Sequence, residues 1–274
     1  MDIKKLLIRA GSGLIYVAII IGCTLWGMNG IYLLGILFAG LATIEFEKLC
    51  GNLSLRNLPL VLLDLAGVYA LLFAFNPTAP IITLCAWVAI MIVRMISELY
   101  TKRENPLRSL ATSALIQLYI GLPFSLMVAT ATISIPKIIL LLFIFLWIND
   151  TGAYIVGSLI GKHKLFERVS PKKSWEGFFG GLIFNIGAAF LFCYCINSYF
   201  GFHSNIWIWI GWTLIVTIFG TWGDLIESLI KRFLNVKDSG NLIPGHGGIL
   251  DRIDSFLLSM PAAFLYVVYL LIIY

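Results

Sequence analysis

The chain has 274 residues, of which 60% are hydrophobic and only 12% are charged. A soluble globular domain is nearer half apolar and a quarter charged, so this composition excludes an ordinary soluble protein and predicts an integral membrane protein. The formal net charge of +5 does not require a nucleic-acid partner, because the cytoplasmic loops of membrane proteins collect Lys and Arg. The five cysteines form no C-x-x-C pair, so neither a disulfide framework nor a zinc site is indicated.

Apolar runs separated by polar residues predict an all-α polytopic membrane protein with about nine transmembrane helices. One crossing takes about 20 apolar residues, so we expect a single membrane domain, 1–274, with N-terminal helices in 1–135 and catalytic helices and two polar loops in 136–274. No segment shows the period-2 alternation of a strand. The predicted helices cover Leu6–Trp26, Ile31–Leu49, Leu58–Phe75, Ile81–Ser97, Leu110–Ile133, Pro136–Asp150, Glu176–Asn197, Ile206–Arg232 and Leu250–Tyr274.

The distribution of basic residues predicts the orientation of these helices. When nine helices are threaded with the N-terminus in the cytoplasm, 18 of the 19 Lys and Arg residues fall on the cytoplasmic side, and only Lys137 falls outside. Such an excess is typical of cytoplasmic loops, so the N-terminus is expected inside and the C-terminus outside. The two richest polar segments, 161–177 and 228–254, then face the cytoplasm.

The end of the eighth predicted helix carries Asp224, Glu227, Ser228 and Lys231. Their spacing of i, i+3, i+4 and i+7 places the four side chains on one helical face. Carboxylates near a membrane are costly unless they face water, a counter-charge or a metal ion. The pattern therefore indicates either a metal-binding face or a structural network between the carboxylates and the lysine.

The ninth predicted helix opens with Asp251 and Asp254, which are again i, i+3 neighbours. A carboxylate at a helix N-terminus interacts favourably with the helix dipole, but this accounts better for one carboxylate than for two on a shared face. Together with Asp224, the two residues would form a compact site of oxygen ligands. Hard cations such as Mg²⁺ bind few protein carboxylates and leave positions for substrate phosphates.

The loop before the ninth helix contains Gly245, Gly247 and Gly248. Small residues let backbone N–H groups approach a phosphate, although G-H-G-G by itself is a weak signal that also fits a turn. His246 fits a phosphate donor, an acid or a packing residue, and the sequence leaves these alternatives open. The sequence has no G-x-x-x-x-G-K-[ST] pattern, so a P-loop is not available.

The second polar segment reads G-K-H-K-L-F-E-R-V-S-P-K-K-S-W-E-G, from 161 to 177. Its cations either only enforce membrane orientation or form a phosphate-binding surface on the cytoplasmic side. Lys172, Lys173 and Ser174 lead from it into the seventh helix. Upstream, a polar group from Asn149 to Tyr154 interrupts an apolar run, and Asp150 could line the same cavity.

Two further carboxylates, Glu45 and Asp64, fall within the second and third predicted helices. A carboxylate inside a membrane requires a partner or a water-filled path. The sequence does not decide between an ion path and a packing contact for either residue.

Residues 228–254 resemble, without a gap, the signature of the phosphatidate cytidylyltransferase (CDP-diacylglycerol synthase) family. Three upstream segments, S-P-K-K-S-W-E-G, G-D-L-x-E-S and D-T-x-A-Y, look like other motifs of this family. The resemblance covers Asn149–Asp254, whereas the N-terminal half agrees only in being polytopic. The fixed signature positions that are present are Ser228, Lys231, Arg232, Lys237, Asp238, His246, Gly247, Gly248, Asp251, Arg252 and Asp254.

The resemblance implies that CTP and phosphatidic acid react to give CDP-diacylglycerol and pyrophosphate in phospholipid biosynthesis. It also implies a usually dimeric protein of the bacterial inner membrane, with its site facing the cytoplasm, and Mg²⁺ with room for a second cation, divalent or K⁺. No nucleic-acid partner is expected. The metal ligands would be Asp224, Asp251 and Asp254, with Lys231 and His246 as further catalytic residues. Substrate would be bound by Lys172, Lys173, Ser174, Ser228, Arg232, Lys237, Asp238, Gly247, Gly248 and Arg252.

Three other functions compete with this one. A secondary transporter also uses intramembrane carboxylates, but here the charges cluster at one end and no inverted repeat is visible. A CDP-alcohol phosphatidyltransferase would carry the pattern D-G-x2-A-R…G-x3-D-x3-D, which this sequence lacks. A CTP-dependent enzyme acting on another lipid phosphate stays open.

Overall fold

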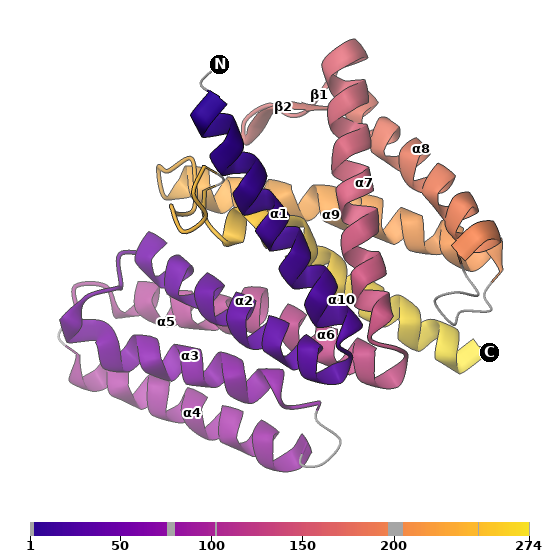
Figure 1. The fold of residues 1–274 in the computed structure, drawn as a ribbon. Coiled ribbons are helices and arrows are strands. Elements are labelled where there is room, and N and C mark those ends of the chain that lie inside the picture. The colour runs from indigo at the N-terminus through magenta and orange to yellow at the C-terminus, as the bar shows by residue number, and fades with distance from the viewer. Residues whose placement is uncertain (1–2, 76–79, 102, 197–204, 246, 274) are drawn as a thin grey trace. The chain divides into compact units, whose positions relative to one another are not determined.

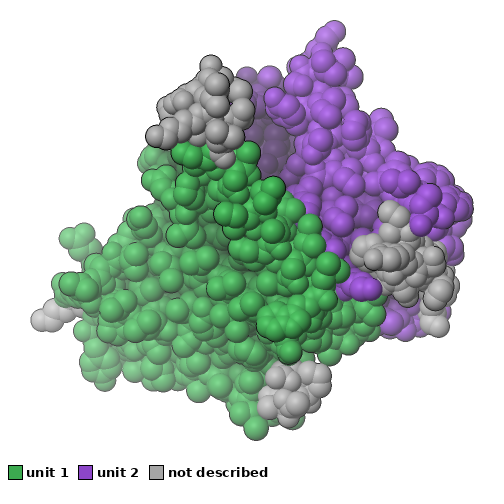
Figure 2. Space-filling model, viewed as in Figure 1, with its two compact units in different colours: residues 1–136, 234–253 green, residues 137–233, 254–274 purple. Residues whose placement is uncertain are grey.

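The computed structural model describes residues 3–75, 80–101, 103–196, 205–245 and 247–273. In this part of the chain nine helices are long and apolar enough to cross a membrane, which confirms the predicted all-α polytopic fold. The orientation of the termini and the organisation as a single membrane domain stay predictions. The chain divides into two compact units, residues 1–136 with 234–253 and residues 137–233 with 254–274 (Figure 2).

Among the described residues, the first unit contains helices α1 to α6 and the start of α10. Neighbouring helices α2, α3 and α4 lie side by side within it (Figure 1), and the side chains of Leu34, Leu72 and Met127 are buried in its core. A short 3-10 turn, Leu55–Asn57, leads into the third helix. The helices are α1 (Ile3–Leu25), α2 (Met28–Leu49), α3 (Leu58–Leu72), α4 (Pro80–Tyr100), α5 (Pro106–Leu115) and α6 (Leu122–Ile133).

The crossing predicted over Leu110–Ile133 is longer in the structure and is not a uniform α-helix. It begins at Pro106 and contains a π-helical segment, Ile116–Gly121, between α5 and α6. Pro123, in the first turn of α6, has no N–H to donate and its ring would clash with a carbonyl one turn earlier. A wider turn before the proline accommodates both effects.

Local signals fix the helix ends in this unit. Asn105 caps α5, because its side chain accepts the backbone N–H of Arg108 at 2.9 Å, and Pro106 occupies the first turn. Helix α2 ends at Leu49, and Gly51 follows with a φ of +75°. Glycine adopts this left-handed conformation without the steric cost of a Cβ.

The second unit contains α7 to α10 and a two-stranded antiparallel sheet. Helices α7 and α8 lie side by side, and the sheet connects them at one end (Figure 1). The last helix begins in the first unit with residues 250–253 and continues in the second. The elements are α7 (Lys137–Ile160), β1 (Lys164–Phe166), β2 (Ser170–Ser174), α8 (Trp175–Leu191) with a π-helical end (Phe192–Ile196), α9 (Ile206–Phe233) and α10 (Leu250–Ile273).

The prediction that the sixth helix ends at the polar pair Asn149-Asp150 is wrong, because α7 continues to Ile160. Asn149 is buried inside the helix pair, where a Cβ on Gly181 of α8 would lie 2.5 Å from its Oδ1 atom. The amide is therefore a buried contact between α7 and α8. A polar residue ends a helix where its side chain competes for the backbone groups of that helix. The side chain of Asn149 is buried against α8 instead, so α7 continues past it.

The sheet itself was missed, because segment 161–177 was expected to be a loop. Strands β1 and β2 pair antiparallel, with Lys164 opposite Ser174 and Phe166 opposite Ser170. Leu165 in β1 and Val169 in the turn are buried. Strands of three and five residues rich in Lys and Ser show no period-2 alternation, so the pairing left no sequence signal.

Glycines allow the helices of the second unit to pack closely. A Cβ on Gly157 of α7 would lie 3.4 Å from the Cα of Gly177 in α8, so the two backbones are nearly in contact. On α9, a Cβ on Gly223 would lie 2.6 Å from the carbonyl oxygen of Asp254 in α10. Small residues at such crossings are typical of membrane helix packing. The crossing at Gly223 also brings the backbone of Asp254 against the turn of α9 that carries Asp224.

Candidate functional site

A cavity of about 560 Å³ lies within the second unit. Its walls come from α7, both strands of the sheet, the start of α8 and the C-terminal half of α9. Cations and carboxylates share this cavity, as expected of a site for a charged ligand. Among its lining residues are Asn149, Asp150, Tyr154, Lys164, Lys172, Lys173, Ser174, Thr221 and Asp224.

The sheet brings a predicted phosphate-binding lysine against a predicted metal ligand. Lys173 Nζ on β2 lies 2.6 Å from Asp224 Oδ2 on α9 and also donates to the carbonyl oxygen of Thr221 at 3.4 Å. Both charged side chains are partly open, at 26% and 32% exposure. An ion pair of this exposure contributes little to stability, so the lysine can exchange its carboxylate partner for an anion in the cavity.

The polar face predicted on the eighth helix is present on α9. Ser228 Oγ donates to Asp224 Oδ1 at 3.2 Å, one turn away. Lys231 Nζ lies 3.1 Å from Glu227 Oε1, and both of these side chains are largely buried. The structural network between carboxylates and lysine therefore exists, and Asp224 additionally lines the cavity. Arg232, the next residue along, is exposed.

Three carboxylates of the second unit act on a fourth, Asp254. Asp254, near the start of α10, is subject to the charges of Asp224, Glu227 and Asp150. Like charges held this close repel, and a bound cation would relieve the repulsion. Within the described residues no three His, Cys, Asp or Glu side chains are arranged to hold a metal ion as they stand. The carboxylate oxygens fit a hard cation that takes further ligands from substrate or water.

Ser174, predicted to bind substrate, has a local structural role. It is the N-cap of α8, and its Oγ accepts the backbone N–H of Gly177 at 3.2 Å. The backbone N–H groups of Lys162 and His163 donate to the carboxylate of Glu176, and His163 Nδ1 lies 2.6 Å from Glu176 Oε1. These contacts fix both ends of the sheet to the first turn of α8. Lys172 and Lys173 therefore project from a braced segment.

Asp251 belongs to the first unit, where its carboxylate organises the glycine-rich loop. Oδ2 accepts the backbone N–H of Ser239 at 3.0 Å, the Ser239 hydroxyl at 3.0 Å and the backbone N–H of Gly248 at 2.9 Å. A Cβ on Gly247, which has a φ of +87°, would lie 2.6 Å from the same oxygen. Asp251 thus closes the loop onto the start of α10, and the glycine is required there.

The loop is also held by α1. Arg9 Nε donates to the carbonyl oxygen of Gly245 at 2.9 Å, and Ser12 Oγ donates to that of Pro244 at 3.0 Å. The hydroxyl of Tyr16 donates to the carbonyl oxygen of Arg252 at 2.8 Å. These three residues recur about one turn apart on one face of α1. Sequence reasoning assigned them no role, because their partners lie more than 230 residues away in the chain.

The predicted residues thus fall into two groups. The second unit contains Lys172, Lys173, Ser174, Asp224, Ser228, Lys231, Arg232 and Asp254, and the first contains Lys237, Asp238, Gly247, Gly248, Asp251 and Arg252. Lys237, Asp238 and Arg252 are exposed. His246 lies outside the described residues. The assignment of roles to these residues, including the three metal ligands, stays a prediction.

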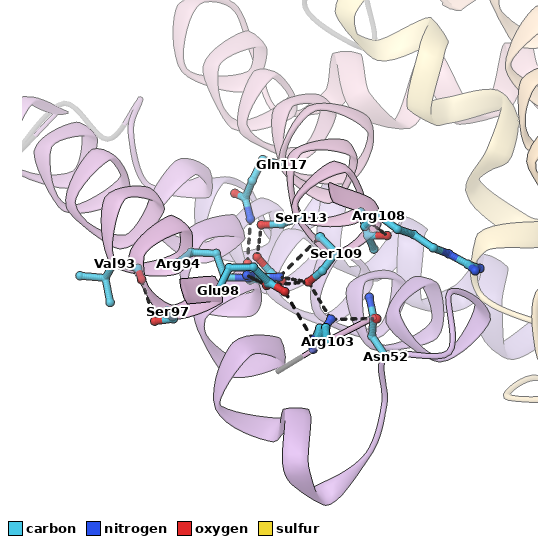
Figure 3. A network of polar contacts seen from close by, with 12 residues as sticks. Asn52, Val93, Arg94, Ser97, Glu98, Arg103, Arg108, Ser109, Ser113 and Gln117 are labelled. Atoms are coloured by element: carbon cyan, nitrogen blue, oxygen red, sulfur yellow. Dashed lines mark hydrogen bonds and ion pairs between the residues drawn. The ribbon is translucent and has the colours of Figure 1, made fainter. Parts of the chain in front are cut away.

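Asp64 proves to be a packing contact in a buried polar cluster of the first unit, which also contains Arg94, Glu98, Ser109 and Ser113. Figure 3 labels the last four residues. Arg94 on α4 reaches Asp64 on α3 and Glu98 one turn along its own helix, at 3.1 and 2.9 Å. Ser113 on α5 donates to the second carboxylate oxygen of Asp64. The cluster ties three helices together.

These features define an α-helical integral membrane protein with a charged cavity suited to an anionic ligand. The model of the cytidylyltransferase family matches residues 7–270, so the chain belongs to this family. A phosphatidate cytidylyltransferase of Staphylococcus aureus (strain COL) is 38% identical over 186 residues, which are 68% of this chain and 70% of the relative. Phosphatidate cytidylyltransferases of Staphylococcus haemolyticus (strain JCSC1435) and Staphylococcus epidermidis (strain ATCC 12228) are 46% and 45% identical over 143 residues, 52% of this chain and 53% of each relative.

Proposed function

We infer that this protein transfers the cytidylyl group of CTP to phosphatidic acid, giving CDP-diacylglycerol and pyrophosphate for phospholipid synthesis. The observation that carries this inference is the family match over residues 7–270, together with relatives of that name at 38–46% identity. The cavity of the second unit supports it, because lysines and carboxylates line one space. A nucleoside triphosphate bound with a metal ion requires both kinds of side chain.

The reaction requires neutralisation of the negative charge on the phosphates more than it requires a strong general base. The phosphate of phosphatidic acid is already an anionic nucleophile at neutral pH, so the protein must bring two polyanions together and stabilise the departing pyrophosphate. Lys173 and Lys172 line the cavity, and in the proposed reaction they hold phosphate oxygens. Ser228 holds the carboxylate of Asp224 in one orientation through its hydroxyl.

We propose Mg²⁺ as the cofactor, with room for a second cation, held by Asp224 and Asp254 and completed by Asp251. When bound, the metal ion would act as a Lewis acid on the α-phosphate and neutralise charge on the leaving group. The mutual repulsion of the carboxylates around Asp254 supports this proposal. Lys231 pairs with Glu227 and Lys173 pairs with Asp224, so a cation bound at Asp224 would take the place of the Lys173 ammonium there.

The proposed setting is the plasma membrane of a bacterium, with the site facing the cytoplasm where CTP is present. The bacterial relatives and the excess of Lys and Arg in the expected inner loops support it. Alkaline phosphatase fused after the last residue should be active, since it would then lie outside the cytoplasm. An inactive fusion beside an active one at the loop containing Lys137 would contradict the proposed position of the C-terminus.

We also propose a homodimer, which the mass of the detergent-solubilised particle would test.

The decisive experiment is CDP-diacylglycerol formation by purified protein supplied with CTP, Mg²⁺ and phosphatidic acid. Product that requires all three would support the function. No product from folded protein with diacyl phosphatidic acid would contradict it, and other lipid phosphates and then ion-coupled transport would be examined next.

Replacing Lys173 by Met is expected to lower kcat/KM for CTP by about 10- to 100-fold, because one charge-assisted contact to phosphate is lost. The matched control is Lys162→Met, in the same segment but outside the lining of the cavity, which should change kcat/KM less than twofold. Equal effects of the two substitutions would show that Lys173 contributes only to the general positive charge of the segment.

A further inference from the structure

Glu45 of α2 lies beneath the loop that the family signature occupies, although it is nearly 200 residues away in the chain. Its side chain is 7% exposed. Oε2 accepts the backbone N–H of Ile249 at 2.9 Å, and Oε1 accepts that of Leu250 at 3.2 Å. These are the N–H groups at the start of α10, which have no partner inside the helix. Glu45 is therefore an N-terminal cap supplied by another helix.

Ser239 links this cap to the carboxylate of Asp251. Its hydroxyl contacts Glu45 Oε1, lies 3.0 Å from Asp251 Oδ2 and accepts the backbone N–H of Asp251 at 3.4 Å. A hydroxyl has only one proton, so it donates to one carboxylate at a time. The hydroxyl nevertheless holds both carboxylates at fixed positions, because each lies within hydrogen-bonding distance of it. Ser239 is 3% exposed, so water does not compete for these contacts.

Two glycines of the loop are explained by the same carboxylate. A Cβ on Gly248 would overlap Glu45 Oε1, and a Cβ on Gly240 would lie 2.9 Å from Glu45 Oε2. The loop thus closes around Glu45 from both sides, and any larger residue at either position would displace it. A buried carboxylate surrounded this closely by donors is costly to desolvate unless every contact is kept, so its position is narrowly defined.

We propose that Glu45 is a positioning residue: it fixes the start of α10 and, through Ser239, the orientation of the Asp251 carboxylate. Its consequence for catalysis rests on the proposed function, in which Asp251 is a metal ligand. Groups that orient a ligand in this way typically change metal affinity or activity by about 10- to 100-fold when they are altered. Glu45 itself need not touch substrate.

The test compares Glu45→Gln with Glu47→Gln in the full-length protein. Both residues lie on α2, both are buried, and both substitutions remove one carboxylate. The side chain of Glu47 instead interacts with Asp64 and Asn52, away from the loop contacts of Glu45. Glu47→Gln therefore controls for the replacement of a buried carboxyl group by an amide on the same helix.

Two readouts are needed. Glu45→Gln should raise the Mg²⁺ concentration for half-maximal CDP-diacylglycerol formation by about tenfold, whereas Glu47→Gln should shift it less than twofold. Hydrogen–deuterium exchange, measured without Mg²⁺ or substrate, should become about tenfold faster at Ile249 and Leu250 in Glu45→Gln only. If Glu45→Gln does not fold, Ser239→Ala removes the link to Asp251 and should give the same shift in Mg²⁺ dependence.

Wild-type exchange at Ile249 and Leu250 in Glu45→Gln would overturn the proposal, as would an equal change in Mg²⁺ dependence in Glu47→Gln. If the wild-type protein makes no CDP-diacylglycerol, the proposed function fails by itself. The exchange measurement still decides whether Glu45 positions the loop, because it does not depend on the reaction.

Discussion

Asp251→Asn is expected to lower CDP-diacylglycerol formation by about 10³-fold or more, because a metal ligand stabilises the transition state by several kcal/mol. The loop should stay closed in this variant. The carbonyl oxygen of asparagine can replace Oδ2 as the acceptor for Ser239 and Gly248. Asp251→Asn removes the charge but keeps the shape of the side chain and these hydrogen bonds. Its effect on activity can therefore be measured without a change in loop structure.

The comparison with Asp251→Ala makes this separation measurable. Alanine removes the acceptor as well as the charge, so hydrogen–deuterium exchange at Gly248 should accelerate in Asp251→Ala but not in Asp251→Asn. Glu104→Gln, an exposed acid in the loop after α4, is the control for charge removal and should retain wild-type activity. If Asp251→Asn keeps more than a tenth of the activity, Asp251 serves the loop alone and is not a metal ligand.

Helix positions were largely predictable from the sequence, because apolar segments flanked by charged residues define them. The starts of α9 at Ile206 and α10 at Leu250 agree with prediction. The end of α7 was wrong because the amide of Asn149 is buried against α8, which a single sequence does not reveal. The short sheet was missed because its pairing depends on the packing of Leu165 and Val169 and not on a periodic pattern.

The candidate site was predictable only where its contacts are local. Asp224 and Ser228 are one helical turn apart, so their shared face follows from spacing alone. Lys173 is 51 residues from Asp224, and only the motif that contains it suggested a common role. The position of Glu45 within a predicted helix indicated that its carboxylate needs partners. Those partners lie about 200 residues away in the chain. Chain connectivity carries no information on contacts at that separation.

Arg94→Met is expected to destabilise the protein by about 3–5 kcal/mol. It leaves the buried carboxylate of Asp64 without its counter-charge and leaves Glu98 with Arg103 alone, at 3.7 Å. Arg94 is 2% exposed and contacts Asp64, Glu98 and the hydroxyl of Ser109 (Figure 3). Each partner comes from a different turn or helix, so the guanidinium cannot be replaced by solvent. Thermal unfolding in detergent should show the loss. Arg108→Met, whose side chain points away from this cluster (Figure 3), should leave the unfolding temperature within a few degrees of wild type.

The same cluster allows a sharper test of cause. If the loss of stability in Arg94→Met comes from unpaired charge, then neutralising the carboxylates that Arg94 contacts should remove much of that loss. The triple variant Asp64→Asn, Arg94→Met, Glu98→Gln should therefore be more stable than Arg94→Met alone, since buried ion pairs replaced as a whole are often nearly neutral. The asparagine can still accept from Ser113, as Asp64 does. A triple variant less stable than Arg94→Met would mean that the packing of the arginine side chain, and not charge balance, holds α3, α4 and α5 together.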